Sequence, residues 1–188
     1  MEILVISVII FLLLFYLMYI YVVKAKNKVL ESMSDIDVQL KKRYDLIPNM
    51  LQLAAKFMEH EKNLMLQLAE IRTKALASSF ITSPKEKIEL EKLFDAKLHE
   101  FKVSLENYPD LKSNQTMITA MQSMNEVEEH IAAARRFYNS NVTALKNIVE
   151  IFPLSFIASF LKIDYKQTPF FEVSENEKQS INSAEYFK

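Results

Sequence analysis

An uninterrupted apolar segment occupies residues 3–23 (ILVISVIIFLLLFYLMYIYVV) and contains no charged residue. As a helix it extends about 31 Å, close to the roughly 30 Å hydrocarbon core of a bilayer. Tyr16, Tyr19 and Tyr21 lie near its C-terminal end, where interfacial aromatic residues collect. A signal peptide cleaved at Val23–Ala25 is the alternative, but no basic side chain precedes the run, and the run exceeds the roughly 7–15 residues of a signal-peptide core. We therefore predict an uncleaved transmembrane anchor.

Basic residues follow the anchor, whereas only Glu2 and the terminal amine precede it. They are Lys24, Lys26, Lys28, Lys41, Lys42 and Arg43. Because cytoplasmic flanks of membrane spans carry an excess of Lys and Arg, we predict an N-terminus outside and the large C-terminal part in the cytoplasm. The reverse topology is the alternative. The predicted partner of residues 3–23 is the lipid bilayer.

Charge balance and the absence of cysteine restrict the function of the remaining chain. About 165 residues follow the anchor, enough for one domain with its own core. The 23 basic and 24 acidic residues leave no basic excess, so we predict no nucleic-acid partner. Without cysteine the chain has no disulfide, no thiolate metal ligand and no cysteine nucleophile.

Glycine is also absent. Loops that cradle phosphate groups need glycine for close backbone approach, so P-loop, Rossmann and kinase-type nucleotide sites are excluded. The G-x-S-x-G nucleophile elbow is excluded for the same reason. Tight β-hairpin turns lose their preferred residue, which argues against an all-β fold. A chain of long helices with short polar connections remains.

Residues 29–78 carry one apolar stripe at steps of mostly three or four, which indicates helix. The stripe comprises Val29, Met33, Ile36, Leu40, Tyr44, Ile47, Leu51, Ala54, Phe57, Leu64, Leu68, Ile71 and Ala75. Its one long step runs from Phe57 to Leu64, with Glu61 at the expected apolar place. Pro48 removes a backbone hydrogen bond inside the stripe. Either one long helix bends near residues 45–48, or a second helix begins with Pro48 in its first turn. Because the stripe keeps its phase across Pro48, we favour the bend.

Two further helices have recognisable starts. Ser83 to Glu86 forms a capping box with Pro84 at the first helical position. The apolar face of that helix is Ile88, Leu90, Leu93, Leu98, Phe101, Val103 and Leu105, ahead of a stop at Tyr108-Pro109. Asn114 is the expected N-cap of a helix to about Glu150. Its stripe is Met117, Met121, Met124, Val127, Ile131, Ala134, Tyr138, Val142, Leu145, Val149 and Phe152.

An aromatic segment, residues 154–171, follows Pro153. We favour an arrangement in which it folds back and covers one end of the bundle, and the alternative places it on the membrane face. The predicted fold class is all-α, with an N-terminal transmembrane helix followed by an antiparallel up-and-down bundle of long helices. The expected divisions are an anchor with a basic neck (1–28), the bundle (29–171) and a polar C-terminal tail (172–188).

Several short motifs occur in a fixed order along the chain. They are residues 36–50 (IDVQLKKRYDLIPNM), His60-Glu61, residues 108–112 (YPDLK), residues 134–139 (ARRFYN), Phe152-Pro153 and residues 170–172 (FFE). In this order they resemble the LemA family over nearly the whole chain. The resemblance implies a bacterial inner-membrane protein with a single span, an outside N-terminus and a cytoplasmic helical bundle. It implies no reaction, because the family has no established activity, although one branch is associated with magnetosome membranes. Many relatives have glycine within residues 158–163, which puts the turn there in doubt.

Polar residues at the edges of the stripes are the candidate site. They are Asp37, Arg43, Glu128, Arg135, Arg136 and Asn139. Arginine at the rim of a helix–helix seam pairs well with a carboxylate on a neighbouring helix, and we expect the pairs Asp37–Arg135 and Arg43–Glu128. Such pairs set helix register more than they stabilise. The alternative is a basic pocket for an anionic ligand or lipid headgroup, formed by Arg43, Arg135 and Arg136.

No metal, cofactor or catalytic group is predicted. A di-iron bundle needs Glu three residues before His. The residues at that distance before His60, His99 and His130 are Phe57, Ala96 and Val127. No Ser, His and Asp have a spacing that selects them as a catalytic set. We expect a non-enzymatic scaffold or interaction protein at the membrane, with protein partners or further copies of itself; an enzyme is the remaining alternative.

Overall fold

The computed structural model describes residues 1–163 and 168–171, and the predicted C-terminal tail (172–188) lies outside them. The described part of the chain is helical and contains no strand, which confirms the all-α prediction. The elements are α1 (Glu2–Ala54), α2 (Lys62–Ala77), α3 (Pro84–Ser104), the 3₁₀ turn η1 (Leu105–Asn107), α4 (Pro109–Lys112), α5 (Gln115–Glu150) and α6 (Leu154–Phe160).

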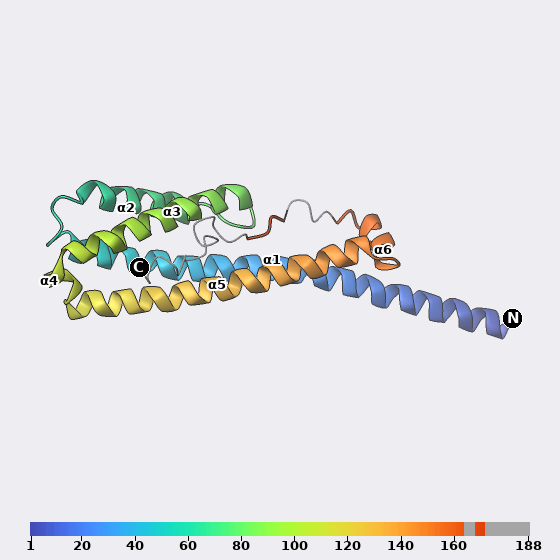
Figure 1. The fold of residues 1–188 in the computed structure, drawn as a ribbon. Helices are drawn as coiled ribbons and strands as arrows, with labels where there is room; N and C mark the ends of the chain where they lie inside the picture. The colour runs from blue at the N-terminus through green and yellow to red at the C-terminus, as the bar shows by residue number, and fades with distance from the viewer. Residues whose placement is uncertain (164–167, 172–188) are drawn as a thin grey trace, which may run out of the picture.

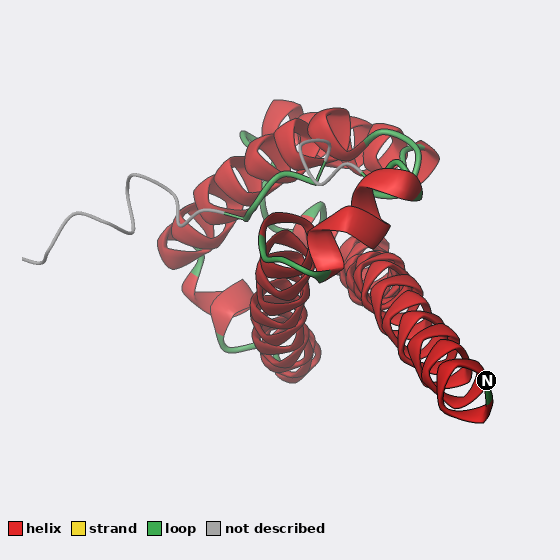
Figure 2. Ribbon diagram, turned by 90° about the vertical axis from the view of Figure 1, so that its right-hand side faces the viewer, coloured by secondary structure: helices red, strands yellow, loops and turns green. Residues whose placement is uncertain are grey.

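The C-terminal half of α1 and the whole of α5 form an antiparallel pair that runs the length of the bundle (Figure 1). The α2–α3 hairpin covers this pair on one side, and the N-terminal half of α1 projects beyond it alone (Figures 1 and 2). The resulting core is continuous and includes Ile36, Leu40, Phe94, Phe101 and Met124. Short connections between antiparallel helices thus give the expected bundle.

Helix α1 passes through Pro48 without a break, so the alternative in which a second helix begins at Pro48 is wrong. Pro48 has no N–H to donate to the carbonyl of Tyr44, four residues earlier. Instead Arg72 on α2 donates its Nε–H to that carbonyl at 2.7 Å. The acceptor that proline leaves unpaired is therefore satisfied by the neighbouring helix, and the buried stripe continues to Met50 and Ala54.

The predicted helix over residues 29–78 is interrupted at a different place. Helix α1 ends at Ala54 and α2 begins at Lys62. The break coincides with the long step from Phe57 to Leu64, where Glu61 occupies the place that the apolar stripe would need. Met58 is buried in the connection and Glu61 accepts a hydrogen bond from the Tyr108 hydroxyl at 2.5 Å.

The start of α3 is as predicted, but its buried face agrees with the prediction only in part. Pro84 is the first helical residue, although the Ser83 side chain makes no capping hydrogen bond. Leu93 and Val103 were expected on the apolar face and are exposed. Leu98 and Phe101 are buried as predicted, and the rest of the buried face of α3 comprises Lys87, Glu91 and Phe94. Charged partners on α1 and α5 rotate α3 to this face, as described below.

Helix α5 begins as predicted, with the Asn114 side chain accepting hydrogen bonds from the amides of Thr116 and Met117. Buried residues recur every seventh position, at Met117, Met124, Ile131, Tyr138 and Leu145, which is the repeat of a helix–helix seam. The expected stripe residue Phe152 is exposed, because α5 ends at Glu150.

Within the segment 154–171, helix α6 packs across the end of the α1–α5 pair, in a cluster with Val22 and Ile148. It ends in a turn without glycine. The amide of Ile163 donates to the carbonyl of Ala158 and the amide of Lys162 to that of Ser159, both at 3.0 Å, which is a Schellman motif. Lys162 supplies the left-handed residue with φ of 52°, so the turn forms at a cost of about 1 kcal/mol where glycine would be unstrained.

Candidate functional site

Arg43 lies at the centre of a charged network between α1, α3 and α5. It is 3% exposed and projects from the buried stripe of α1 toward α3. Its Nη1 donates to Asp95 Oδ1 at 2.6 Å and its Nη2 donates to Glu91 Oε2. The guanidinium carbon lies 4.6 Å from the ring centroid of Phe94. The predicted pair Arg43–Glu128 is therefore wrong, because α3 brings its own carboxylates to Arg43.

Glu91 is the acidic centre of the network and is 2% exposed. Besides Arg43, the Tyr44 hydroxyl donates to its carboxylate, so two neighbouring residues of α1 hold both oxygens. Burial raises the pKa of Glu91 to about 7, although the positive charge of Arg43 opposes that rise. The free-energy cost of removing this carboxyl from water thus exceeds the attraction of its arginine partner, and Glu91 titrates near neutral pH.

Arg135 on α5 reaches the same carboxylates as Arg43. Its Nη2 is 3.9 Å from Glu91 Oε2 and 3.9 Å from Asp95 Oδ2. The predicted pair Asp37–Arg135 is wrong, because the α2–α3 hairpin engages Asp37 instead. The Arg135 guanidinium also lies 5.3 Å from the ring centroid of Phe171.

Lys87 is a buried cation on α3 that closes the C-terminal end of α2. Its Nζ donates to the carbonyl of Ala75 at 2.5 Å and to that of Ser78 at 3.4 Å. The final carbonyls of a helix have no partner within the helix and carry partial negative charge, so an ammonium group suits this place. Burial lowers the pKa of Lys87, while the nearby charge of Asp37 opposes the fall.

Asp37 fixes the loop that joins α2 to α3. Its carboxylate accepts from the Ser79 hydroxyl at 2.9 Å and from the Phe80 amide at 3.1 Å. Phe80 is fully buried beside Phe171, with ring centroids 4.9 Å apart. This carboxylate on α1 therefore holds the hairpin loop over the core.

Asn139 and Tyr138 on α5 hold the segment that contains Phe171. The Asn139 side chain donates to the carbonyl of Phe171 at 2.9 Å and accepts from its amide at 3.0 Å. The Tyr138 hydroxyl donates to the carbonyl of Pro169 at 3.0 Å, and burial raises the pKa of this tyrosine to about 12. The late aromatic segment is thus bound to α5 by both its backbone and its ring.

The last two predicted residues lie outside the network. Glu128 accepts from Lys102 on α3, with Nζ to Oε2 at 2.9 Å, in a partly exposed pair. Arg136 is exposed on the surface of α5, beside exposed Phe137.

Comparison with known proteins identifies the family of the chain. The sequence profile of the LemA family matches residues 32–183. The chain belongs to the LemA family. A relative described as Protein LemA from Metamycoplasma hominis is 22% identical over 176 residues, which cover 92% of this chain and 78% of the relative.

Three of the six motifs that carried the LemA resemblance meet in space at the network. Residues 36–50 contribute Asp37, Arg43 and Tyr44, residues 134–139 contribute Arg135, Tyr138 and Asn139, and the last motif contributes Phe171. Motifs far apart in this LemA sequence therefore belong to one interhelical cluster.

Sequence reasoning missed the carboxylates of α3. Glu91, Asp95 and Lys87 do not belong to the quoted LemA motifs. They were also overlooked because the buried face of α3 was predicted from its apolar residues alone. Their spacing was the available signal, since Lys87 and Glu91 continue at steps of three and four into Phe94, Leu98 and Phe101. Charged residues in phase with an apolar stripe indicate a buried pair on the facing helix.

The arrangement is suited to fixing helix register. The oxygens of Glu91 are occupied by Arg43 and Tyr44, and Arg43 and Arg135 both face carboxylates. A basic pocket for an anion on these two arginines would have to displace those carboxylates. A buried pair of this kind costs desolvation energy and specifies which helix faces meet.

Proposed function

We propose that this LemA-family chain is a membrane-anchored scaffold that holds a helical bundle at the cytoplasmic face for protein partners. The observation that carries the proposal is the continuity of α1 from Glu2 to Ala54. One end of this helix is an unpacked apolar rod, and the other end is the central helix of the bundle. A span that continues into the domain without a joint sets the distance and orientation of the bundle relative to the bilayer.

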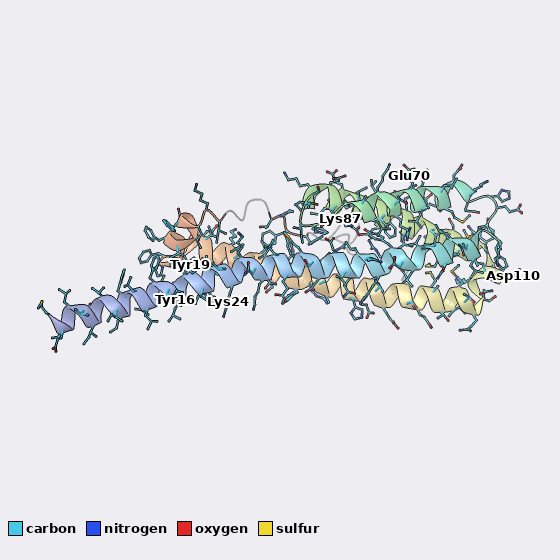
Figure 3. The ribbon with its side chains drawn as sticks, turned by 180° about the vertical axis from the view of Figure 1, so that it is seen from behind. Tyr16, Tyr19, Lys24, Glu70, Lys87 and Asp110 are labelled. Atoms are coloured by element: carbon cyan, nitrogen blue, oxygen red, sulfur yellow. The ribbon has the colours of Figure 1, made fainter. Side chains whose placement is uncertain are left out.

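The exposed apolar surface of α1 supports the membrane part of the proposal. Its most apolar window is long and apolar enough to cross a membrane, and none of that window is buried. Side chains radiate from this half of α1 in all directions (Figure 3). Exposure of such an apolar surface to water is unfavourable, whereas the hydrocarbon of a bilayer covers it without any protein partner.

Topology is tested in the natural cysteine-free background of the chain. Two single substitutions, Glu2→Cys and Ser140→Cys, place a thiol at the N-terminus and on the exposed surface of α5. A membrane-impermeant maleimide added to intact cells should label Glu2→Cys, and it should label Ser140→Cys only after permeabilisation. The opposite labelling pattern supports the reverse topology and contradicts the cytoplasmic bundle.

Arg136 and Phe137 are the proposed contact residues for a protein partner. Both are exposed on α5, whereas their motif neighbours Arg135, Tyr138 and Asn139 have intramolecular contacts. An exposed arginine beside an exposed aromatic ring is the combination typical of interface anchors.

Crosslinking in native membranes, followed by mass spectrometry, tests the partner. The wild-type chain should recover other membrane-associated proteins, and the double variant Arg136→Ala, Phe137→Ala should lose them. Leu93→Ala removes a similarly exposed apolar side chain from α3 and should keep them. Recovery of only the chain itself favours self-association. Equal recovery from the double variant and the wild type removes Arg136 and Phe137 from the interface.

A further inference from the structure

Helix α6 lies against α1 inside the segment proposed to cross the membrane. Val22, which is 0% exposed, forms a small cluster with Ile148, Ile157 and Ala158, and Met18 packs against the same cluster. Val22 and Met18 both belong to the apolar run 3–23. If that run crosses a bilayer, α6 sits at the level where the run leaves the hydrocarbon.

The orientation of α6 relative to α1 fits a position at the membrane surface. Between α5 and α6 the chain bends by 95°, and α5 runs alongside α1 (Figure 1). Helix α6 therefore lies across the long helices, as the view from that end of the bundle shows (Figure 2). A helix perpendicular to a membrane-spanning helix lies in the plane of the membrane surface.

The outer face of this corner is aromatic and has no protein partner in the described structure. Phe152, Phe156 and Phe160 are 82%, 68% and 79% exposed. Phe156 and Phe160 are four residues apart in α6 and lie on one side of it, and Phe152 lies in the turn just before the helix. The opposite side, with Ile157 and Ala158, is the side that packs on α1. Three adjacent exposed phenylalanines form an unusual surface for contact with water.

Neighbouring residues on α1 have the composition of a membrane interface. Tyr16, Tyr19 and Tyr21 are exposed at the level of α6, and Tyr19 lies beside it in Figure 3. Lys24 and Lys26 are exposed just beyond, and Lys162 is exposed at the end of α6. Aromatic residues collect at the boundary between headgroups and acyl chains, and lysines collect at the headgroups.

We propose that Phe152, Phe156 and Phe160 insert into the interface of the bilayer crossed by α1, with α6 parallel to its surface. This inference rests on the proposed membrane anchor. It gives the bundle a second point of attachment, offset sideways from α1, which prevents rotation of the bundle about the anchor and sets its tilt. The bundle would then contact the membrane at two places, through the spanning helix and through residues 152–160 beside it.

The test uses the natural absence of tryptophan from the chain. The full-length protein is reconstituted into vesicles of phosphatidylcholine and phosphatidylglycerol as three single variants. Phe156→Trp probes α6, Leu12→Trp probes the span, and Phe137→Trp probes an exposed position about 20 Å farther along α5. Lipids brominated near the headgroups or near the bilayer centre quench tryptophan according to its depth.

The expected result is depth-specific. Emission from Phe156→Trp should shift to the blue relative to Phe137→Trp and be quenched most by bromine near the headgroups. Emission from Leu12→Trp should be quenched most by bromine near the bilayer centre, and that from Phe137→Trp by neither lipid. If Phe156→Trp is unquenched while Leu12→Trp is quenched, the interfacial role of α6 fails and the anchor stands. If Leu12→Trp is unquenched, the anchor fails together with the inference that rests on it.

Discussion

The two halves of α1 form one continuous helix but distribute their apolar side chains differently. The N-terminal half, residues 3–21, exposes nearly every apolar side chain around the whole circumference. The C-terminal half buries a single stripe from Val29 to Ala54 and presents mostly polar side chains elsewhere. The first pattern is typical of a helix in an apolar medium, whereas the second is typical of a helix with protein on one side and water on the other. The backbone is the same in both, so side-chain pattern alone assigns the environment.

The halves also differ in what they tolerate. The bundle half contains a buried arginine and a proline, each acceptable because a neighbouring helix supplies the missing partner. The anchor half from residue 3 contains neither a charge nor a proline up to Val23. Within the described residues, α6 and the end of α5 reach this half only at its C-terminal end, where Val22 clusters with Ile148 and Ile157. The predictions below test this difference, and each uses chemical denaturation of the detergent-solubilised protein followed by circular dichroism.

The largest effect is expected from Arg43→Ala, measured at mildly alkaline pH. It leaves the buried Glu91 carboxylate without its cation, and breaking a buried ion pair costs roughly 3–5 kcal/mol of unfolding free energy. The control is Lys42→Ala, an exposed neighbour on the same helix, with an effect within about 0.5 kcal/mol. Equal effects of the two variants would contradict a structural role for the network.

A leucine in each half compares the two environments directly. Leu40 is fully buried in the core, so Leu40→Ala should lower the unfolding free energy by roughly 2–5 kcal/mol. Leu13 is exposed in the anchor half, and Leu13→Ala should change bundle unfolding by less than about 0.5 kcal/mol. A large loss from Leu13→Ala would mean that the anchor half packs on protein.

The pH dependence of stability isolates Glu91. Its pKa is about 7 in the folded chain against an ordinary value of 4.5, so between these values the folded state binds more protons than the unfolded state. This group's contribution to stability therefore falls as pH rises from 4.5 to 7, by up to about 3 kcal/mol, and stays constant above. Glu91→Gln should remove that fall, and Glu128→Gln, in a partly exposed pair, should keep it. An unchanged slope in Glu91→Gln would refute the raised pKa.

The smallest effect concerns the proline in the bundle half. Arg72→Ala removes the donor to the Tyr44 carbonyl and should cost about 1–2 kcal/mol. In the Pro48→Ala background the restored amide can serve that carbonyl, so Arg72→Ala should cost less there. Lys74→Ala, an exposed cation on α2, should cost the same in both backgrounds. Additive effects of Pro48→Ala and Arg72→Ala would disprove the compensation.

Much of the fold was predictable because local chemistry decides it. The stripe of α1, the proline start of α3 and the Asn114 cap of α5 depend on neighbours along the chain. The candidate site was predictable only in part. Asp37, Arg43, Arg135 and Asn139 were found at stripe edges, but the predicted partners of Arg43 and Asp37 were wrong. Which carboxylates face Arg43 depends on the rotation of α3 about its own axis. The apolar residues of α3 alone do not determine that rotation.

The sequence by itself determined an apolar segment long enough to span a membrane, the helical character of the described residues and membership of the LemA family. The apolar run, the absence of glycine and the ordered motifs are all properties of the linear chain. The tertiary structure alone decided which carboxylates meet Arg43, that Arg72 replaces the hydrogen bond lost at Pro48, and that α6 lies against the end of the span. These outcomes depend on contacts between residues far apart in the chain, where burial and hydrogen bonding choose among several locally acceptable partners.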